Sequence, residues 1–258
     1  MKEINKNIVF VGSGIKFYAH LTVECISHIE NADIVLYLVN EPAMMQWLQE
    51  NSKRNNSLEA IYNSYPNRAD AYNAISNQII ESLEIYSSIC VVIYGHPLVL
   101  CMPTRLTINN APKNVNIKIL PGIAADSCLY ADLGIDPVAN GCQSYEATEF
   151  LLYQKKIDAT ANLILWQVGV IGCLGDTSAH NNQKGISLLK ERLLTEYPQN
   201  HSVTLYEATQ YAHIASKIVE TPLYDLDNIE ISQLMTLYVP PLSNRSINVA
   251  LVEFLKNS

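Results

Sequence analysis

Short runs of apolar residues, each ended by turn residues, alternate along the chain with segments in which apolar residues recur every three or four positions. The short runs are rich in β-branched residues and are typical of buried strands, whereas the other spacing is typical of helices. We predict strands at 7–12, 32–39, 88–95, 115–120 and 163–169. We predict helices at 19–31, 41–51 and 69–86. The near-continuous apolar strands favour the α/β class, with a sheet covered by helices on both faces.

The same alternation continues toward the C-terminus. We predict a helix at 183–196 and strands at 202–207, 215–220 and 235–241. The last strand ends at a Pro-Pro pair, because proline cannot donate a hydrogen bond to a neighbouring strand. The sequence LPGIAAD at 120–126 is typical of a turn, and 258 residues exceed the commonest domain size. We therefore predict two α/β lobes, at 1–122 and 123–258.

Composition and charge narrow the range of functions. The chain is 48% hydrophobic and contains no apolar run long enough to span a bilayer. Its net charge is -8 and its 17 lysines and arginines form no cluster, which argues against binding to nucleic acid or to an anionic membrane. The N-terminal MKEINKNIVFVG lacks the apolar stretch of a signal peptide, so we expect a cytoplasmic protein.

The spacing of ligand-type residues does not indicate a metal site. The six cysteines include no CxxC pair and are typical of small core residues, and the six histidines form no HExxH motif. Asp126, Asp132 and Asp136 lie close together in the sequence and could bind a metal. Aspartates at such positions more often cap helices and turns. We predict no metal.

Three turns at strand ends are candidates for a ligand site, because ligands of open α/β sheets bind beyond the carboxyl ends of the strands. They are VGSGIKF (11–17), YGHPLVLCMP (94–103) and LPGIAADSCLYADLGIDP (120–137). The first turn lacks the third glycine of a dinucleotide fingerprint, where Phe17 stands, and the GK[ST] of a P-loop. Its two glycines are equally explained by a tight turn from strand to helix.

The segment YNSYPNRADAY (62–72) gathers three tyrosines and an arginine around a Pro-Asn turn and has little to bury. If a helix starts near Arg68, then Arg68 and Tyr72 share one face of it, and Pro66 suits the entrance of that helix. An arginine that stays protonated could lower the pKa of a nearby phenol or stabilise an oxyanion. The alternative is an ordinary amphipathic loop and helix with half-buried tyrosines.

Five motifs in this order carry a resemblance to a known family: VGSGI, YGHPLV, LPGIAADSCLYADLGIDP, GCQSYEATEFL and LWQVG. From about residue 7 to residue 241 the chain resembles S-adenosylmethionine-dependent methyltransferases of the tetrapyrrole-methylase type. The tyrosine-rich segment more narrowly resembles borosin α-N-methyltransferases, which methylate backbone amides of a ribosomally made peptide. The resemblance implies a two-lobed, non-Rossmann α/β fold with the cofactor, S-adenosylmethionine, in the cleft between the lobes.

The resemblance also implies which residues contact the cofactor. Matching the motifs position by position gives Gly12, Tyr94, His96, Val99, Ala124, Ala125, Gln167, Tyr206, Ala208, Met235 and Thr236. The family more often has serine where Ala124 stands, so a backbone contact or a water replaces one side-chain hydrogen bond here. The backbone of His96, more than its imidazole, is expected to face the cofactor.

The same resemblance assigns the chemistry to the tyrosine-rich segment. A peptide nitrogen is a poor nucleophile, because its lone pair is delocalised into the carbonyl group. We expect Tyr65 to accept the amide proton, and Arg68 and Tyr72 to stabilise the imidate oxygen. Tyr62 and Tyr94 are expected to orient the reacting groups. S-adenosylhomocysteine is the expected product of the cofactor.

The partners implied by the resemblance are peptides and a second copy of the chain. Fused borosin enzymes continue into a long extension that carries their own peptide, whereas this sequence ends soon after YVPP, in INVALVEFLKNS. We therefore expect a split enzyme that acts in trans on a separate precursor peptide. Family members are homodimers, which implies a homodimer here and, with two precursor chains bound, a heterotetramer.

Two other functions fit parts of the sequence. The three turns alone would also permit a methyltransferase of the same fold that acts on a tetrapyrrole or on ribosomal RNA, although the acidic charge argues against RNA. A peptide-binding protein without catalysis could instead use the tyrosines as a recognition surface.

Overall fold

The computed structural model describes residues 6–175, 183–243 and 246–257, which form two compact units. The first unit comprises residues 6–134, 173–175 and 207–217. The second comprises residues 135–172, 183–206, 218–243 and 246–257. Short segments from late in the sequence thus belong with the first unit. The expected single division into lobes at 1–122 and 123–258 stays a prediction.

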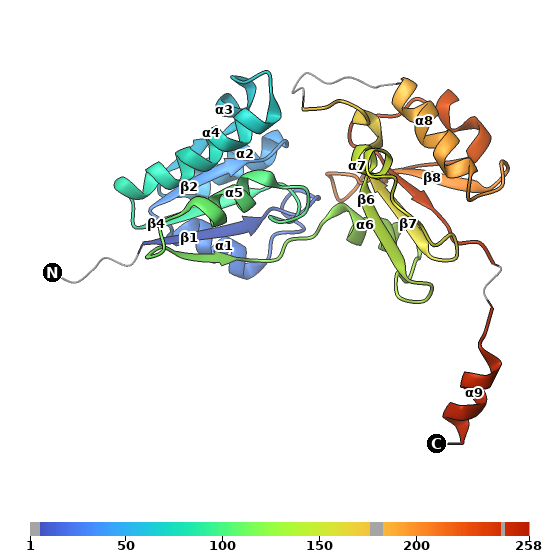
Figure 1. The fold of residues 1–258 in the computed structure, drawn as a ribbon. Coiled ribbons are helices and arrows are strands. Elements are labelled where there is room, and N and C mark those ends of the chain that lie inside the picture. The colour runs from blue at the N-terminus through green and yellow to red at the C-terminus, as the bar shows by residue number, and fades with distance from the viewer. Residues whose placement is uncertain (1–5, 176–182, 244–245, 258) are drawn as a thin grey trace. The chain divides into compact units, whose positions relative to one another are not determined.

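A parallel five-stranded sheet forms the centre of the first unit (Figure 1). Its strands are β1 (Asn7–Gly12), β2 (Ile34–Leu38), β3 (Asn55–Ser57), β4 (Ser88–Ile93) and β5 (Asn116–Ile119), in the order β3-β2-β4-β1-β5. This order differs from the 3-2-1-4-5-6 order of the Rossmann fold. The predicted strands β1, β2, β4 and β5 are confirmed. The pattern does not predict β3, because its sequence NNS is short and polar.

Alternating side chains along β1 enter two separate apolar clusters. Ile8 and Phe10 belong to one cluster, whereas Val9 and Val11 belong to the other. Helices α1 (Val23–Asn31) and α2 (Pro42–Asn51) pack on the Val9 face, and α3 (Glu59–Asn63) and α4 (Arg68–Glu81) pack on the Ile8 face. In Figure 1, α1 and α4 lie on opposite sides of the sheet. Both faces are therefore covered, as the apolar strands predict.

The remaining helices of the first unit follow β4 and β5. They are α5 (Met102–Asn110) and α6 (Ala125–Leu133). α5 packs beside α4, where the Thr107 hydroxyl donates a hydrogen bond to the Ser76 hydroxyl at 3.2 Å. α5 is not predicted by the spacing of apolar residues.

The second unit is built on a mixed five-stranded sheet. Its strands are β6 (Cys142–Glu146), β7 (Asn162–Trp166), β8 (Ser202–Glu207), β9 (Lys217–Pro222) and β10 (Thr236–Val239), in the order β6-β7-β10-β8-β9. β6 pairs with β7 in parallel, and β10 pairs with β7 and with β8 in antiparallel fashion. β10 ends directly before Pro240, as the Pro-Pro pair predicts.

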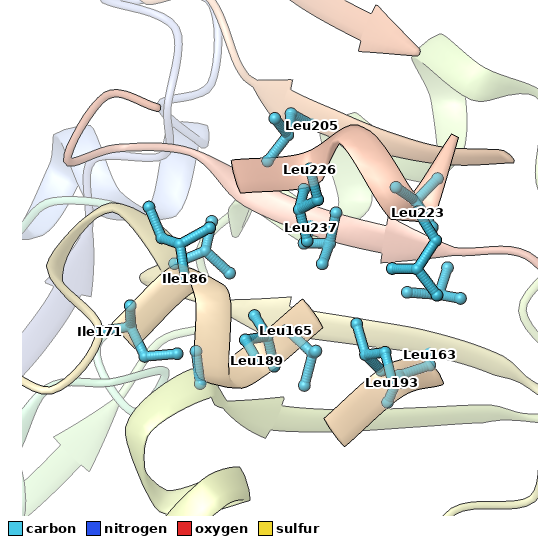
Figure 2. Packing of buried hydrophobic residues seen from close by; sticks show 14 of the residues in the cluster. Leu163, Leu165, Ile171, Ile186, Leu189, Leu193, Leu205, Leu223, Leu226 and Leu237 are labelled. Carbon is cyan, nitrogen blue, oxygen red and sulfur yellow. The ribbon is translucent and has the colours of Figure 1, made fainter. Parts of the chain in front are cut away.

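Helices cover one face of this sheet and close its core. Leu163 and Leu165 of β7 pack with Leu189 of α8 (Gln183–Leu194) and Leu226 of the 3-10 helix η3 (Leu223–Asn228), as Figure 2 shows. α7 (Ala147–Leu152) adds Phe150 to the same cluster. The leucines whose spacing predicts the helix at 183–196 thus lie on the face that this helix buries.

Two predicted elements end three or more residues earlier than expected. The strand predicted at 163–169 stops at Trp166, because Gln167 has a left-handed backbone (φ 58°) that cannot continue an extended strand, and the 3-10 helix η2 (Val168–Val170) follows. The helix predicted at 69–86 stops at Glu81, where the 3-10 helix η1 (Ser82–Glu84) begins.

The last described helix, α9 (Val249–Lys256), has no buried residue. Within the described ranges, no helix combines the length and the apolar character needed to cross a membrane.

Candidate active site

The three glycine-containing turns meet at the carboxyl edge of the first sheet. Gly12 ends β1, Gly95 follows β4, and Gly122 follows β5. A Cβ atom built on Gly12 would lie 2.2 Å from the carbonyl oxygen of Gly95 and 2.8 Å from the Cα atom of Gly122. Gly14 and Gly95 exchange backbone hydrogen bonds of 3.2 and 3.1 Å. The turns that the sequence presents separately are therefore packed backbone against backbone.

A small cavity lies beside these turns. It is lined by Ser13, Gly14, Ile15, Phe17, Val39, Glu41, Met44 and Tyr94. Glu41 is 4% exposed and caps α2, because its two carboxylate oxygens accept hydrogen bonds from the amides of Ala43 (3.0 Å) and Met44 (2.6 Å). The cavity wall therefore combines apolar side chains and backbone with one carboxylate, that of Glu41, whose oxygens already accept hydrogen bonds.

His20 stabilises the loop that follows Gly14. Its Nδ1 atom accepts hydrogen bonds from the amides of Ile15 and Lys16, both at 3.1 Å. Burial, and to a smaller extent the charge of Lys16, lower the pKa of His20. The imidazole is therefore neutral at pH 7, as its role as an acceptor requires.

Helix α4 begins at Arg68, as the sequence predicts. The Asn67 side chain caps the helix by accepting a hydrogen bond from the Ala69 amide at 2.8 Å, and the Arg68 amide donates to the carbonyl oxygen of Gly175 at 2.6 Å. Helical geometry places Tyr72 one turn after Arg68 on the same face. The predicted juxtaposition of these two side chains on one helix face is confirmed.

Tyr72 also pairs with Tyr62 of α3. Their ring centroids are 6.0 Å apart and their planes are tilted by 32°. Burial is the main cause that raises the pKa of Tyr72 to about 12; the nearby Tyr62 raises it further, and Arg68 lowers it. For Tyr72, burial outweighs the positive charge of Arg68. Tyr72 keeps its proton and can donate a hydrogen bond.

The guanidinium of Arg68 retains an unused donor. Its Nε atom is buried and has no hydrogen-bond partner among the residues that the structure describes. A buried N–H group without a partner is costly, so this atom is suited to an acceptor that a ligand brings. Tyr65 lies in the turn before α4 and is 38% exposed.

Tyr94 and His96 follow β4, and their side chains have different surroundings. Burial raises the pKa of Tyr94, a hydrogen bond with Gln210 lowers it, and Cys128 and Glu207 raise it. The Nδ1 atom of His96 accepts a hydrogen bond from the Leu98 amide at 3.1 Å. The imidazole of His96 is therefore used within its own turn.

The third turn leads into α6. Ala124 is the N-cap residue and provides no side-chain hydrogen bond to the first turn of the helix. Asp136 accepts a hydrogen bond from the Val138 amide at 2.9 Å, and Asp132 accepts one from the Ser216 hydroxyl at 2.6 Å. In the described part of the chain, no group of three or more His, Cys, Asp or Glu side chains could hold a metal ion.

Four of the expected cofactor contacts lie in the second unit, at the ends of neighbouring strands. Thr236 of β10 is directly opposite Tyr206 of β8, and Met235 precedes Thr236. Gln167 follows β7, which pairs with β10 on the other side. Tyr206, Met235 and Thr236 are all buried.

The sequence does not single out three residues at the edge of the first sheet. They are Glu41, Gln210 and Tyr211, and the Tyr211 hydroxyl donates a hydrogen bond to Glu41 Oε1 at 2.8 Å. The only available signal was the Glu-Pro pair at 41–42, which fits a helix start with proline at its first position. Gln210 and Tyr211 lie in a loop without periodic spacing.

Comparison with known proteins places this geometry in a family. A family model described as Tetrapyrrole (Corrin/Porphyrin) Methylases matches residues 7–227. Two solved structures share the fold: uroporphyrin-III-C-methyltransferase from Thermus thermophilus (TM-score 0.62, 16% identity, 92% of this chain and 94% of that chain) and a diphthine synthase (TM-score 0.63, 15% identity, 98% and 95%). The predicted α/β methyltransferase fold is confirmed.

Curated relatives are closer in sequence. A methyltransferase/ribosomally synthesized cyclic peptide gymnopeptides precursor from Gymnopus fusipes is 34% identical over 240 residues, which cover 91% of this chain and 57% of that protein. A methyltransferase/ribosomally synthesized type I borosin cyclic peptide precursor from Coprinopsis marcescibilis is 31% identical over 247 residues, covering 91% and 62%. The chain thus spans about three fifths of the length of these relatives.

These names correct one prediction. Each relative is described as a single polypeptide that is both methyltransferase and peptide precursor. The prediction of a separate precursor peptide, and with it of a heterotetramer with two precursor chains, is therefore wrong. The expected homodimer stays a prediction.

Proposed function

The chain belongs to the tetrapyrrole (corrin/porphyrin) methylase family, and from this premise we propose that it transfers methyl groups from S-adenosylmethionine to backbone amide nitrogens of a peptide. Sequence similarity supports the peptide over a tetrapyrrole or RNA. The relatives at about 30% identity are named for ribosomally synthesized cyclic peptides, whereas the uroporphyrin methyltransferase is 16% identical and shares the fold alone.

One observation carries the proposal: two hydrogen-bond donors lie on one face at the start of α4. Arg68 has a buried, unpartnered Nε atom, and Tyr72, one helical turn later, keeps its proton because its pKa is raised to about 12. A cation and a neutral hydroxyl in this arrangement suit an oxygen atom on which negative charge develops. The carbonyl oxygen of a peptide bond that is being converted to an imidate is such an atom.

The chemistry of the amide explains why these donors are needed. Charge that moves onto the carbonyl oxygen leaves more electron density on nitrogen, which can then attack an electrophilic carbon. We assign Arg68 and Tyr72 to the carbonyl oxygen and Tyr62 to the orientation of Tyr72, whose ring it contacts. Tyr65, which is 38% exposed, is assigned to the amide proton, and Tyr94 to the orientation of the reacting groups.

The residues at the carboxyl edge of the first sheet fit the methyl donor. The packed glycine turns lie beside a small cavity that Gly14 and Tyr94 line. Ala124 leaves the first turn of α6 without a side-chain cap, so its amides can bind polar groups of a ligand. When bound, S-adenosylmethionine would supply a methyl group that its sulfonium already activates. We propose the cofactor contacts Gly12, Tyr94, His96, Val99, Ala124, Ala125, Gln167, Tyr206, Ala208, Met235 and Thr236.

A chimera tests the proposed function. This chain is joined to the part of the Gymnopus fusipes relative that follows the region of similarity, and the product is incubated with S-adenosylmethionine. We expect intact mass to rise in steps of one methyl group, and tandem mass spectrometry to place the methyl groups on backbone nitrogens. No mass gain, or methyl groups on side chains alone, would contradict the proposal.

Matched tyrosine variants separate chemistry from folding in the same chimera. Tyr72→Phe removes one donor to the carbonyl oxygen, so we expect methylation to fall about a hundredfold with an unchanged midpoint of thermal unfolding. Tyr224→Phe changes a tyrosine of the second unit that is 55% exposed, and is expected to keep full activity. Equal activity of the two variants would mean that the tyrosine-rich segment has no role in catalysis.

A further inference from the structure

The connecting loop, residues 207–217, joins β8 to β9 but belongs to the first unit. Hydrogen bonds within the loop fix its backbone. The Thr209 amide donates to the Ser216 hydroxyl at 3.3 Å, and the Tyr211 amide donates to the Thr209 hydroxyl at 3.2 Å. The side chains of the connecting loop therefore start from defined backbone positions.

Two consecutive residues of the connecting loop bind two consecutive residues that follow β2. Gln210 Nε2 donates a hydrogen bond to Asn40 Oδ1 at 3.1 Å, and the Tyr211 hydroxyl donates one to Glu41 Oε1 at 2.8 Å. In the loop after β1, the Phe17 amide donates to the carbonyl oxygen of Gln210 at 2.8 Å. The connecting loop is therefore held against the segments that follow β1 and β2, at the carboxyl edge of the first sheet.

Of these three contacts, the one to Glu41 involves a charged group. Glu41 is 4% exposed, and its oxygens accept hydrogen bonds from two amides of α2 and from the Tyr211 hydroxyl. A buried carboxylate needs such donors, and its hydrogen bonds are stronger than those between neutral groups. Glu41 also lines the cavity that Gly14 and Tyr94 line. The Tyr211 hydroxyl is thus bound to the wall of the cavity beside which we place the methyl donor.

A second contact to a carboxylate holds the other end of the connecting loop. The Ser216 hydroxyl donates to Oδ2 of Asp132, near the end of α6, at 2.6 Å. Ala208, one of the proposed cofactor contacts, stands in the first part of the loop, directly before Thr209. The position of Ala208 therefore depends on contacts made by other residues of the loop.

We propose that Tyr211 and Glu41 are positioning residues, and that their hydrogen bond keeps the connecting loop, and with it Ala208, at the cavity beside the glycine turns. They act by holding the loop and need not touch the methyl donor. Without this bond the loop should open more often, while the first sheet stays folded. The inference rests on the proposed function only where it assigns the loop to the binding of S-adenosylmethionine.

The first test needs no ligand. Hydrogen exchange of single amides is followed by NMR in the wild type and in Tyr211→Phe. The Phe17 amide is bonded to the connecting loop, so it should exchange about tenfold faster in the variant, the effect of losing one hydrogen bond to a charged group. The amides of Ile15 and Lys16 are bonded to His20 and should keep their wild-type rates. No acceleration at Phe17, or equal acceleration at all three amides, overturns the proposal.

The second test measures the affinity for S-adenosylhomocysteine by calorimetry. Tyr211→Phe should weaken binding about three- to tenfold, the loss expected for one hydrogen bond. Ser216→Ala removes the other anchor and should weaken binding as well. Tyr224→Phe, a 55% exposed tyrosine of the second unit, should bind like the wild type. Wild-type affinity in Tyr211→Phe overturns the assignment of the connecting loop to the donor site.

Kinetics of the chimera separate this inference from the proposed function. Tyr211→Phe should raise the KM for S-adenosylmethionine and leave kcat nearly unchanged, because the residue holds the donor site and takes no part in methyl transfer. A fall in kcat with wild-type KM and affinity overturns the positioning role. If the chimera binds S-adenosylhomocysteine, Tyr211→Phe weakens that binding, and no backbone nitrogen is methylated, the proposed function fails and the positioning role stands.

Discussion

The glycine turns and the tyrosine-rich segment 62–72 both contribute to the proposed site, but they depend on different properties of the chain. At the turns, the backbone atoms of Gly12, Gly95 and Gly122 fill the space that any Cβ atom would need. In the tyrosine-rich segment, Tyr62 and Tyr72 are only partly buried and Tyr65 is exposed. A hydroxyl can be removed there without opening a cavity in the core.

This difference separates the requirements of folding from those of chemistry. A side chain added at a turn must push backbone away from backbone, so fold and activity should be lost together. A hydroxyl or guanidinium removed from the segment should lower activity and leave the fold intact. The predictions below test this contrast, from the largest expected effect to the smallest.

Gly122→Ala should have the largest effect. Its Cβ atom would lie 2.4 Å from the carbonyl oxygen of Gly95 and 2.8 Å from the Cα atom of Gly12, so the two turns must separate. We expect a loss of about 3 kcal/mol in the free energy of unfolding, measured in urea. Gly134→Ala is the control: its φ is +65° but nothing lies within 4 Å, so we expect a cost of about 1 kcal/mol. Equal losses for the two variants would contradict the packing of the turns.

Arg68→Lys should lower activity and leave the stability of the fold nearly unchanged. Lysine keeps the positive charge but lacks the planar guanidinium and its Nε donor, so we expect methylation to fall about a hundredfold. The free energy of unfolding should change by less than about 1 kcal/mol, because the side chain is not part of an apolar cluster. Arg105→Lys, on the exposed surface of α5, is the matched control for both measurements. Equal methylation rates of the two lysine variants would remove Arg68 from the mechanism.

High pH should destabilise the protein through Tyr72. Its pKa is about 12 in the folded protein, against 10.0 for an ordinary tyrosine. Between these values the unfolded chain releases a proton that the folded protein retains, so the free energy of unfolding falls as pH rises from about 10 to 12. Tyr72→Phe should reduce this slope in urea unfolding at several pH values. An unchanged slope would mean that Tyr72 is not buried as described.

Low pH should have the smallest effect, through His20. The pKa of His20 is lowered from 6.5, chiefly by burial, so its stabilising contribution is complete above pH 6.5 and is lost as pH falls below that value. His20→Gln provides a side-chain acceptor that does not titrate. Its unfolding free energy should therefore depend less on pH between 5 and 7 than that of the wild type. The same pH dependence in both proteins would contradict the role of His20 as an acceptor.

Hydrophobic periodicity predicts the elements with strong apolar patterns. β1, β2, β4 and β8 are predicted within two residues at each end, because their side chains are buried on the sheet. β3 is missed because a three-residue polar strand is specified by its pairing with β2 and not by its own pattern. The strand β7 is predicted too long, because periodicity does not reveal the left-handed backbone of Gln167.

Only those parts of the site that lie close together in the sequence could be predicted from it. Arg68 and Tyr72 are close in sequence, so helical spacing alone places them on one face. Glu41 and Tyr211 are far apart in sequence, and only the folded chain brings the hydroxyl to the carboxylate. The protonated state of Tyr72 also depends on burial, which the sequence around it does not reveal.

The most direct test of the central claim is a crystal structure of the chimera with S-adenosylhomocysteine and its peptide segment bound. We predict that Arg68 Nε and the Tyr72 hydroxyl donate hydrogen bonds to the carbonyl oxygen of one peptide bond, whose nitrogen faces the sulfur of the cofactor. A structure in which these two side chains face solvent, while the peptide nitrogen meets the sulfur elsewhere, would contradict the account.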